Sequence, residues 1–139
     1  MERPDKVLII DDDQNTNLLY TMIIRHVMGK TIEIKTFTQA DDGINYLNDE
    51  PQNLDCNVVM FLDINMPVIS GWEALSMLAK SDERVRKKLT IFMVSSSIDP
   101  NDKKRSIEHP YVTDFMEKPL TVEKIKNLFG ERLDTLLSV

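Results

Sequence analysis

Residues 6–13 read KVLIIDDD, a run of aliphatic side chains that ends in three consecutive aspartates. A short, unbroken apolar run of this kind predicts a β-strand that is buried on both faces. Neighbouring carboxylates repel one another, and their removal from water is unfavourable unless a counter-charge is present. The position of Asp11, Asp12 and Asp13 at the end of the most apolar stretch therefore indicates a functional site at the end of this strand.

Four more strand-like segments follow along the chain. They cover residues 31–37, 57–62, 90–94 and 114–119. The second and third of these are as apolar as the first strand, whereas 31–37 and 114–119 carry charged side chains. Continuous apolar strands are typical of the centre of a parallel sheet, and charged strands are typical of its edges.

Helical patterns separate these strands. In the first helix, apolar residues at helical spacing predict the face that packs on the core. These residues are Leu18, Leu19, Met22, Ile23 and Val27. Gly29 is expected to end this helix. Asp13 is expected to cap its start, and Thr38, Ser70 and Thr121 are expected to cap the starts of later helices.

Regular alternation of strands and helices predicts a parallel sheet covered by helices on both faces. With the two charged strands at the edges, the strand order becomes 2-1-3-4-5, which defines an α/β, flavodoxin-like (βα)5 doubly wound fold. A chain of 139 residues is enough for one hydrophobic core. We predict a single domain over residues 1–139, with its core from about residue 5 to residue 137, and expect no output domain.

The composition excludes several classes of protein. The formal net charge is −6 and the isoelectric point is near 4.9, so a nucleic-acid backbone would be repelled. No apolar run approaches the ~20 residues that span a bilayer, and the first residues lack the apolar core of a signal peptide. The single cysteine, Cys56, fits a reducing compartment. We therefore expect a cytoplasmic protein without nucleic-acid or membrane partners.

Polar residues follow four of the predicted strands at the edge where such folds bind ligands. Asp11 and Asp12 end the first strand, Asp63 the third, Ser95 the fourth and Lys118 the fifth. We expect these five residues, called the mouth below, to gather although they are remote in sequence. Three close carboxylates need a cation, and oxygen ligands favour Mg²⁺, with Mn²⁺ as the alternative.

Such a site could transfer a phosphoryl group. A bound Mg²⁺ and Lys118 would together neutralise the charge of the transferring group. Asp63 could act as the nucleophile and form an acyl phosphate. Lys118 and the hydroxyl of Ser95 would then each bind a phosphoryl oxygen.

Four sequence blocks resemble the signature motifs of the receiver domain of two-component response regulators. They are LIIDDD, FLDINMPVISG, MVSSS and FMEKP. The resemblance runs from about residue 5 to residue 137, and it is closest to stand-alone receivers of the chemotaxis-regulator type. It implies that a sensor histidine kinase or a histidine phosphotransfer protein donates a phosphoryl group to Asp63, the phosphoacceptor.

The resemblance also assigns the metal ligands. Asp12 would bind Mg²⁺ directly and Asp11 largely through water. Asp63 would contribute its carboxylate and Asn65 its backbone carbonyl. Asp13 receives no metal role.

The resemblance further implies a conformational switch. Ser95 and Lys118 would bind the phosphoryl group, Phe115 would be the switch aromatic, and Lys118–Pro119 would be a cis peptide. The surface that changes would be formed by the fourth helix, the fifth strand and the fifth helix. It would bind a downstream protein or support a phosphorylation-dependent dimer. Ser96 stands where a smaller residue is common, and its bulk is expected to slow access of water to the phosphate.

Two alternatives stay open. A haloacid-dehalogenase-like aspartyl-phosphate phosphatase would use Asp11 as its nucleophile, but it needs a second acidic pair late in the chain, and none follows Lys118. A receiver fold that serves only as a binding scaffold would not need all five mouth residues. We expect no conventional enzyme, only Mg²⁺-dependent self-phosphorylation from small phosphodonors and autodephosphorylation.

Overall fold

The structure is a computed structural model that describes residues 3–96 and 99–137, with residues 130–137 given by their backbone. Five parallel strands form one sheet in the order β2-β1-β3-β4-β5, which confirms the predicted flavodoxin-like topology. The charged strands β2 and β5 lie at the two edges, as expected. The strands are β1 Lys6–Ile10, β2 Glu33–Phe37, β3 Val58–Asp63, β4 Leu89–Ser95 and β5 Asp114–Glu117.

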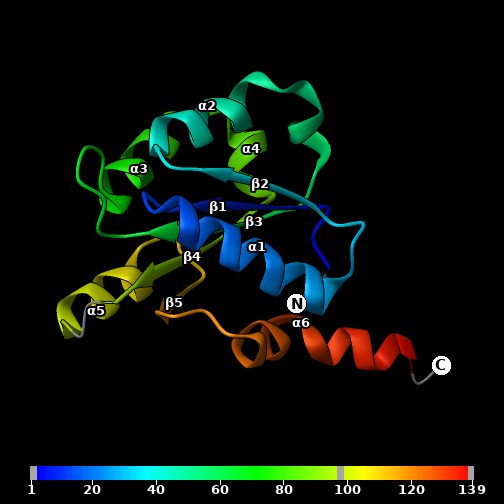
Figure 1. Cartoon of the computed structure of the whole chain (residues 1–139). Helices are drawn as coiled ribbons and strands as arrows, with labels where there is room; N and C mark the ends of the chain where they lie inside the picture. The colour runs from blue at the N-terminus through cyan, green and yellow to red at the C-terminus, as the bar shows by residue number, and fades with distance from the viewer. Residues whose placement is uncertain (1–2, 97–98, 138–139) are drawn as a thin grey trace.

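Helices cover both faces of this sheet. Figure 1 shows α1 and α6 on one face and α2, α3 and α4 on the other, with α5 beside β5. The helices are α1 Gln14–Met28, α2 Ala40–Asp49, η1 Pro51–Asp55, α3 Gly71–Leu78, α4 Glu83–Lys87, α5 Pro100–Glu108 and α6 Val122–Leu137. The sequence predicted five of them. It missed η1 and α4, because a helix of one or two turns is too short to show a helical period.

The central strands divide the core into two clusters. Side chains alternate across a strand, so Leu8 and Ile10 of β1 pack on the face covered by α2 and α3. Val7 and Ile9 pack on the other face, against α1 and α6. Because both faces are covered, every residue of β1 and β3 is buried, as their continuous apolar sequences predicted.

The buried face of α1 differs from the prediction. Leu18, Leu19 and Met22 were expected to face the core, yet they are 61%, 49% and 62% exposed. The buried residues are Asn17, Tyr20, Ile24 and Met28, and Ile23 and Val27 pack partly against the same cluster. The prediction was wrong because α1 is apolar on two sides, so the spacing alone fitted either face.

Most of the predicted helix ends are confirmed. Asp13 caps α1 by accepting from two backbone N–H groups, and Gly29 ends that helix with φ of 98°. Ser70 and Glu73 form a capping box at the start of α3. The hydroxyl of Thr121 accepts from the backbone N–H of Lys124 at 3.1 Å. Thr38 was wrong as a cap, because the N-cap of α2 is the next residue and makes no side-chain hydrogen bond.

A buried lysine anchors the start of β1. Lys6 is only 2% exposed. Its ammonium group donates to the hydroxyl of Tyr46 at 2.5 Å and to Oδ1 of Asn53 at 2.6 Å, and it lies 3.6 Å from Glu33. These partners satisfy the charge that burial would otherwise make unfavourable. Lys6 therefore ties β1 to β2, α2 and η1 at the end of the sheet opposite the mouth.

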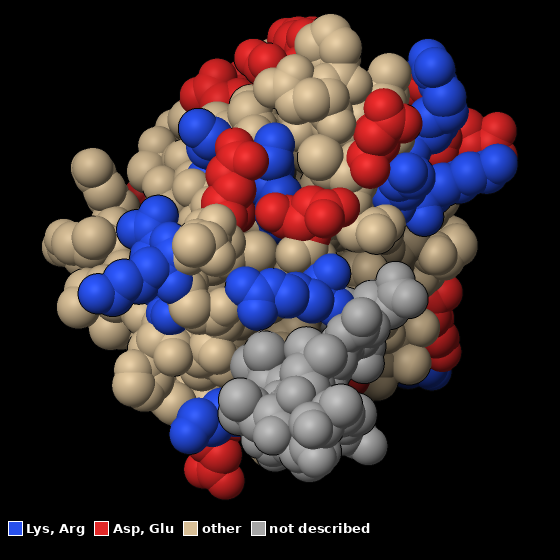
Figure 2. Space-filling model, turned by 90° about the vertical axis from the view of Figure 1, so that its right-hand side faces the viewer, with Lys and Arg blue, Asp and Glu red and all other residues tan. Residues whose placement is uncertain are grey.

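Two features of the outer surface can be described. Within the residues that the structure describes, no helix is long and apolar enough to cross a membrane. Figure 2 views the end of the molecule opposite the mouth, where basic and acidic side chains are interspersed.

Candidate phosphoacceptor site

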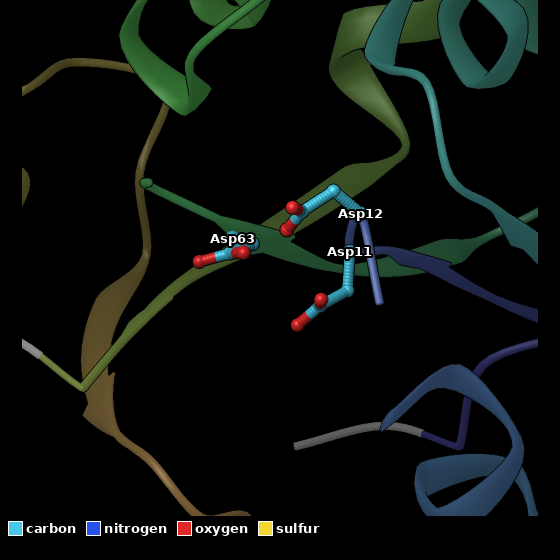
Figure 3. A group of neighbouring side chains, drawn as sticks. All are labelled: Asp11, Asp12 and Asp63. Carbon is cyan, nitrogen blue, oxygen red and sulfur yellow. The ribbon is translucent and has the colours of Figure 1, made fainter. Parts of the chain in front are cut away.

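The carboxyl ends of the parallel strands bring the predicted mouth residues together. Asp11 and Asp12 directly follow β1, and Asp63 is the last residue of β3. Figure 3 shows the three carboxylates converging on one space. One oxygen from each lies within 4.8 Å of the others. The two strands are neighbours in the sheet, so residues 52 positions apart in sequence become adjacent in space.

Lys118 completes this cluster from the end of β5. Its ammonium group lies 2.6 Å from Oδ2 of Asp11 and 3.4 Å from Oδ2 of Asp63. Both of these carboxylates are almost fully buried, whereas Asp12 is exposed. One ammonium group thus faces two buried carboxylates, and the exposed third carboxylate adds further negative charge. The peptide bond between Lys118 and Pro119 is cis, as predicted.

The charge imbalance is visible in the pKa of Asp63. Burial and the nearby carboxylate of Asp11 raise this pKa from 3.8 to about 6, although Lys118 and the backbone N–H of Asn65 act in the opposite direction. For Lys118, burial alone would lower the pKa, but the bond to Asp11 and the attraction of Asp63 outweigh it and raise the pKa. The mouth therefore carries more negative charge than its own lysine neutralises, which favours a cation.

Asn65 links the nucleophile candidate to the predicted switch residue. Its backbone N–H donates to Oδ1 of Asp63 at 3.2 Å, and its side-chain amide donates to Oγ of Ser95 at 3.0 Å. Ser95 is fully buried at the end of β4, and its backbone carbonyl accepts from the N–H of Lys118 at 2.9 Å. Sequence reasoning considered only the backbone carbonyl of Asn65 and missed its amide. In the sequence, only the position of Asn65 two residues after Asp63 indicated that its side chain could lie near the site.

Asn17 is a second residue that sequence reasoning missed. It is 2% exposed on the core side of α1. Its amide donates to the backbone carbonyls of Asp11 at 2.9 Å and Phe37 at 3.3 Å, which are the ends of β1 and β2. It therefore fixes the backbone that carries the first acidic residue. No sequence signal marked it, because Asn17 is the last residue of the polar run that begins at Asp11.

Phe115 lies in β5, half-buried and packed against the core cluster on the side of α2 and α3. Its backbone partner in the sheet is Met93 of β4, two residues before Ser95. Phe115 is thus close in the sheet to the end of β4. Its role as a switch stays a prediction.

A model of the response regulator receiver domain matches residues 7–129. The chain belongs to this family. The receiver fold accounts for the sheet order and for the acidic cluster at its carboxyl edge, which is typical of a phosphoacceptor aspartate. Receiver domains bind Mg²⁺ at such a site, and the three carboxylates here supply the oxygen ligands that this ion prefers.

Solved structures of receivers are similar over nearly the whole chain. A two-component response regulator from Cytophaga hutchinsonii is 33% identical, with a TM-score of 0.78 over 96% of this chain and 99% of that one. A response regulator receiver protein from Dyadobacter fermentans is 24% identical, with a TM-score of 0.79 over 92% of this chain and 97% of that one. At 24% identity, the similarity to the Dyadobacter fermentans structure supports only the fold of this chain.

Curated relatives are more distant. Two-component response regulator-like PRR37 of Oryza sativa is 27% identical over 89% of this chain, and this chain spans only 16% of its length. Probable methanogenesis regulatory protein FilR2 of Methanothrix harundinacea is 24% identical over 90% of this chain and 79% of that protein. The receiver is therefore the shared part, and the activities of the longer proteins do not follow from it.

Proposed function

We propose that this receiver accepts a phosphoryl group on Asp63 in a Mg²⁺-dependent reaction and thereby switches a protein-binding surface. The observation that carries the proposal is the position of Lys118. Its ammonium group lies between the buried carboxylates of Asp11 and Asp63, where it can bind an oxygen of a phosphoryl group placed on Asp63. Electrostatic neutralisation of this kind is the main requirement of phosphoryl transfer.

In the proposed transfer, a carboxylate oxygen of Asp63 attacks the phosphorus of a phosphohistidine. The new P–O bond forms as the P–N bond breaks, and the leaving imidazole nitrogen regains a proton from solvent. A bound Mg²⁺, held by Asp11, Asp12, Asp63 and the backbone carbonyl of Asn65, would supply positive charge to the phosphoryl oxygens. Lys118 provides the second positive charge, and the hydroxyl of Ser95 would donate a hydrogen bond to a phosphoryl oxygen.

The donor is proposed to be a sensor histidine kinase or a histidine phosphotransfer protein, which docks over the mouth. The exposed residues Leu18, Leu19 and Met22, called the apolar patch of α1 below, support this location. Helix α1 starts at Gln14, two residues after Asp12, so its first turns border the mouth. Exposed apolar side chains that gather beside a reactive site are typical of a docking surface.

The output is proposed to be a shift between two existing conformations. A phosphoryl group adds about two negative charges and strong acceptor oxygens beside Ser95. If the hydroxyl moves towards it, Phe115 can turn into the space behind, which reshapes the surface of α5, β5 and α6. This surface would bind a downstream protein or a second copy of the chain.

Intact-mass measurement after incubation with Mg²⁺ and acetyl phosphate tests the proposal. We expect a gain of one phosphoryl group that is lost in Asp63→Asn and when EDTA replaces Mg²⁺. Asp13→Asn is the matched control, because asparagine also caps a helix and Asp13 lies outside the metal cluster. Continuous turnover that depends on Asp11 would instead indicate the phosphatase, and no reaction at all would indicate a scaffold.

A second experiment tests the docking surface. Leu18→Ser should slow phosphorylation by a phosphohistidine-carrying protein, because it removes apolar area from the interface. It should leave phosphorylation by acetyl phosphate unchanged, because that small donor does not contact α1. Equal slowing with both donors would show that the substitution disturbs the mouth and not a docking surface.

A further inference from the structure

The hydrogen bond between Asn65 and Ser95 has no place in the proposed transfer. Ser95 is fully buried, whereas Asn65 is exposed to solvent at the rim of the mouth. The amide of Asn65 donates to Oγ of Ser95 at 3.0 Å. Within the described part of the chain, no hydrogen bond joins Ser95 to Asp63. The hydroxyl oxygen thus accepts a hydrogen bond from Asn65, a residue other than the one that would carry the phosphoryl group.

Serine depends on such a partner more than threonine would. Two heavy atoms on Cβ restrict the side-chain rotamers of threonine, but serine has only its hydroxyl and turns more freely. A hydrogen bond from outside can therefore decide which rotamer Ser95 adopts. The amide of Asn65 is suited to this role because its own backbone N–H is bonded to Oδ1 of Asp63, which fixes its position relative to the nucleophile.

We propose that the side chain of Asn65 is a positioning residue that holds the hydroxyl of Ser95 in its resting orientation. The inference rests on the proposed function, because it concerns how readily the mouth accepts a phosphoryl group. In the resting protein, Ser95 is held towards Asn65. In the phosphorylated protein, its hydroxyl turns towards a phosphoryl oxygen, and the amide of Asn65 transfers its hydrogen bond to water.

This arrangement makes Asn65 a restraint on the switch. The bond stabilises only the resting state, so it lowers the fraction of molecules whose Ser95 is ready to bind a phosphoryl group. Apparent affinity for such a group falls in proportion to that fraction. Since Asn65 is exposed, the net worth of the bond is that of an ordinary hydrogen bond in contact with water, and its removal should change affinity by about two- to tenfold.

Fluoroberyllate binding measures this affinity directly. Fluoroberyllate is a tetrahedral mimic of a phosphoryl group on a carboxylate, and ¹⁹F NMR separates its bound from its free form. We would titrate it, with Mg²⁺ present, into the wild-type chain, Asn65→Ala and Asn65→Leu. Leucine keeps the approximate bulk of asparagine but donates no hydrogen bond, so it separates the loss of the bond from the opening of space.

Both variants should bind fluoroberyllate about two- to tenfold more tightly than the wild type. In a Ser95→Ala background, the same substitutions should change affinity little, because the partner of the amide is gone. Unchanged or weaker binding by both Asn65 variants would overturn the inference, as would equal tightening in the Ser95→Ala background. A wild-type chain that binds no fluoroberyllate with Mg²⁺ would instead refute the proposed function.

Discussion

Neutralising Asp63 should stabilise the metal-free protein, although it should abolish phosphorylation. The reason lies in the mouth, where burial and Asp11 raise the pKa of Asp63 to about 6. A folded-state pKa above the unfolded value means that the folded state binds the proton more tightly than the unfolded state does. Near pH 8 the carboxylate must be charged in both states, and the folded state is then the one that is disfavoured. Asp63→Asn removes that charge.

The magnitude follows from the size of the shift. A rise from 3.8 to about 6 is worth about 3 kcal/mol at about 1.4 kcal/mol per pKa unit. Asparagine keeps an acceptor for the N–H of Asn65, but Lys118 loses one of its two carboxylate partners. We therefore expect a net gain of about 1–2 kcal/mol in the free energy of unfolding. For a domain of this size the gain raises the melting temperature by roughly 3–8 °C.

The gain should depend on pH in a defined direction. Well below pH 3.8, the ordinary pKa of this carboxyl, Asp63 is protonated in both states, so the two proteins should have similar stability. As pH rises towards the folded-state pKa of about 6, the wild type should lose stability relative to the variant, and above it the difference should stay constant. Urea unfolding in EDTA across this range measures the difference. Mg²⁺ should reduce or reverse it, because the ion binds the folded wild type.

Equal stability of the two proteins near pH 8 in EDTA would refute this reasoning, and so would a less stable variant. Either result would mean that water or Lys118 already offsets the charge of Asp63. A gain that is independent of pH would point to packing and not to electrostatics. Asp12→Asn is the matched control, because Asp12 is exposed and its substitution should change stability much less.

Three further predictions follow from single contacts. Gly71→Ala should destabilise the protein by about 1–3 kcal/mol, because its Cβ would lie 2.6 Å from the backbone carbonyl oxygen of Asp63. Gly43→Ala should destabilise it less, because its Cβ would meet the movable end of the Ile10 side chain. Thermal unfolding of both variants measures the difference. Lys6→Met should lower stability by about 1–3 kcal/mol in the same assay, because the buried side chain of Asn53 loses its hydrogen-bond donor. It should leave phosphorylation by acetyl phosphate intact, because Lys6 lies at the end of the sheet opposite the mouth. Ser96→Ala should shorten the lifetime of the phosphoryl group, measured by its decay in intact-mass spectra, and an unchanged lifetime would count against a role for the bulk of Ser96.

The topology of the sheet could be predicted because the strands differ in chemistry. Apart from Lys6 at the start of β1 and Asp63 at the end of β3, these two strands are apolar and are covered on both faces. β2 carries Glu33 and Lys35 and lies at an edge. Parallel strands must place their carboxyl ends at one edge. The convergence of Asp12, Asp63 and Lys118 therefore followed from strand order alone, without any knowledge of side-chain conformation.

The orientation of α1 could not be predicted, because it depends on a polar contact. Apolar spacing favoured Leu18, Leu19 and Met22 as buried residues, and it gave Asn17 no role. In the fold, the backbone carbonyls of Asp11 and Phe37 lie at the ends of two neighbouring strands, and the inward-facing amide of Asn17 donates to both. Such acceptors become apparent only once two strands are aligned.

The exposed side of α1 is apolar although it does not pack on the core. Packing on the core requires one apolar face, and Tyr20, Ile24 and Met28 provide it. A second apolar face on the same helix adds no stability in water and raises the risk of aggregation. The mouth shows the same kind of local conflict, because burial and Asp11 raise the pKa of Asp63 and so disfavour its charged form in the folded protein. Residues that oppose folding in this way are expected at functional sites. Under the proposed function, the negative charge of the mouth would attract Mg²⁺, and the apolar patch of α1 would lie where the donor protein approaches.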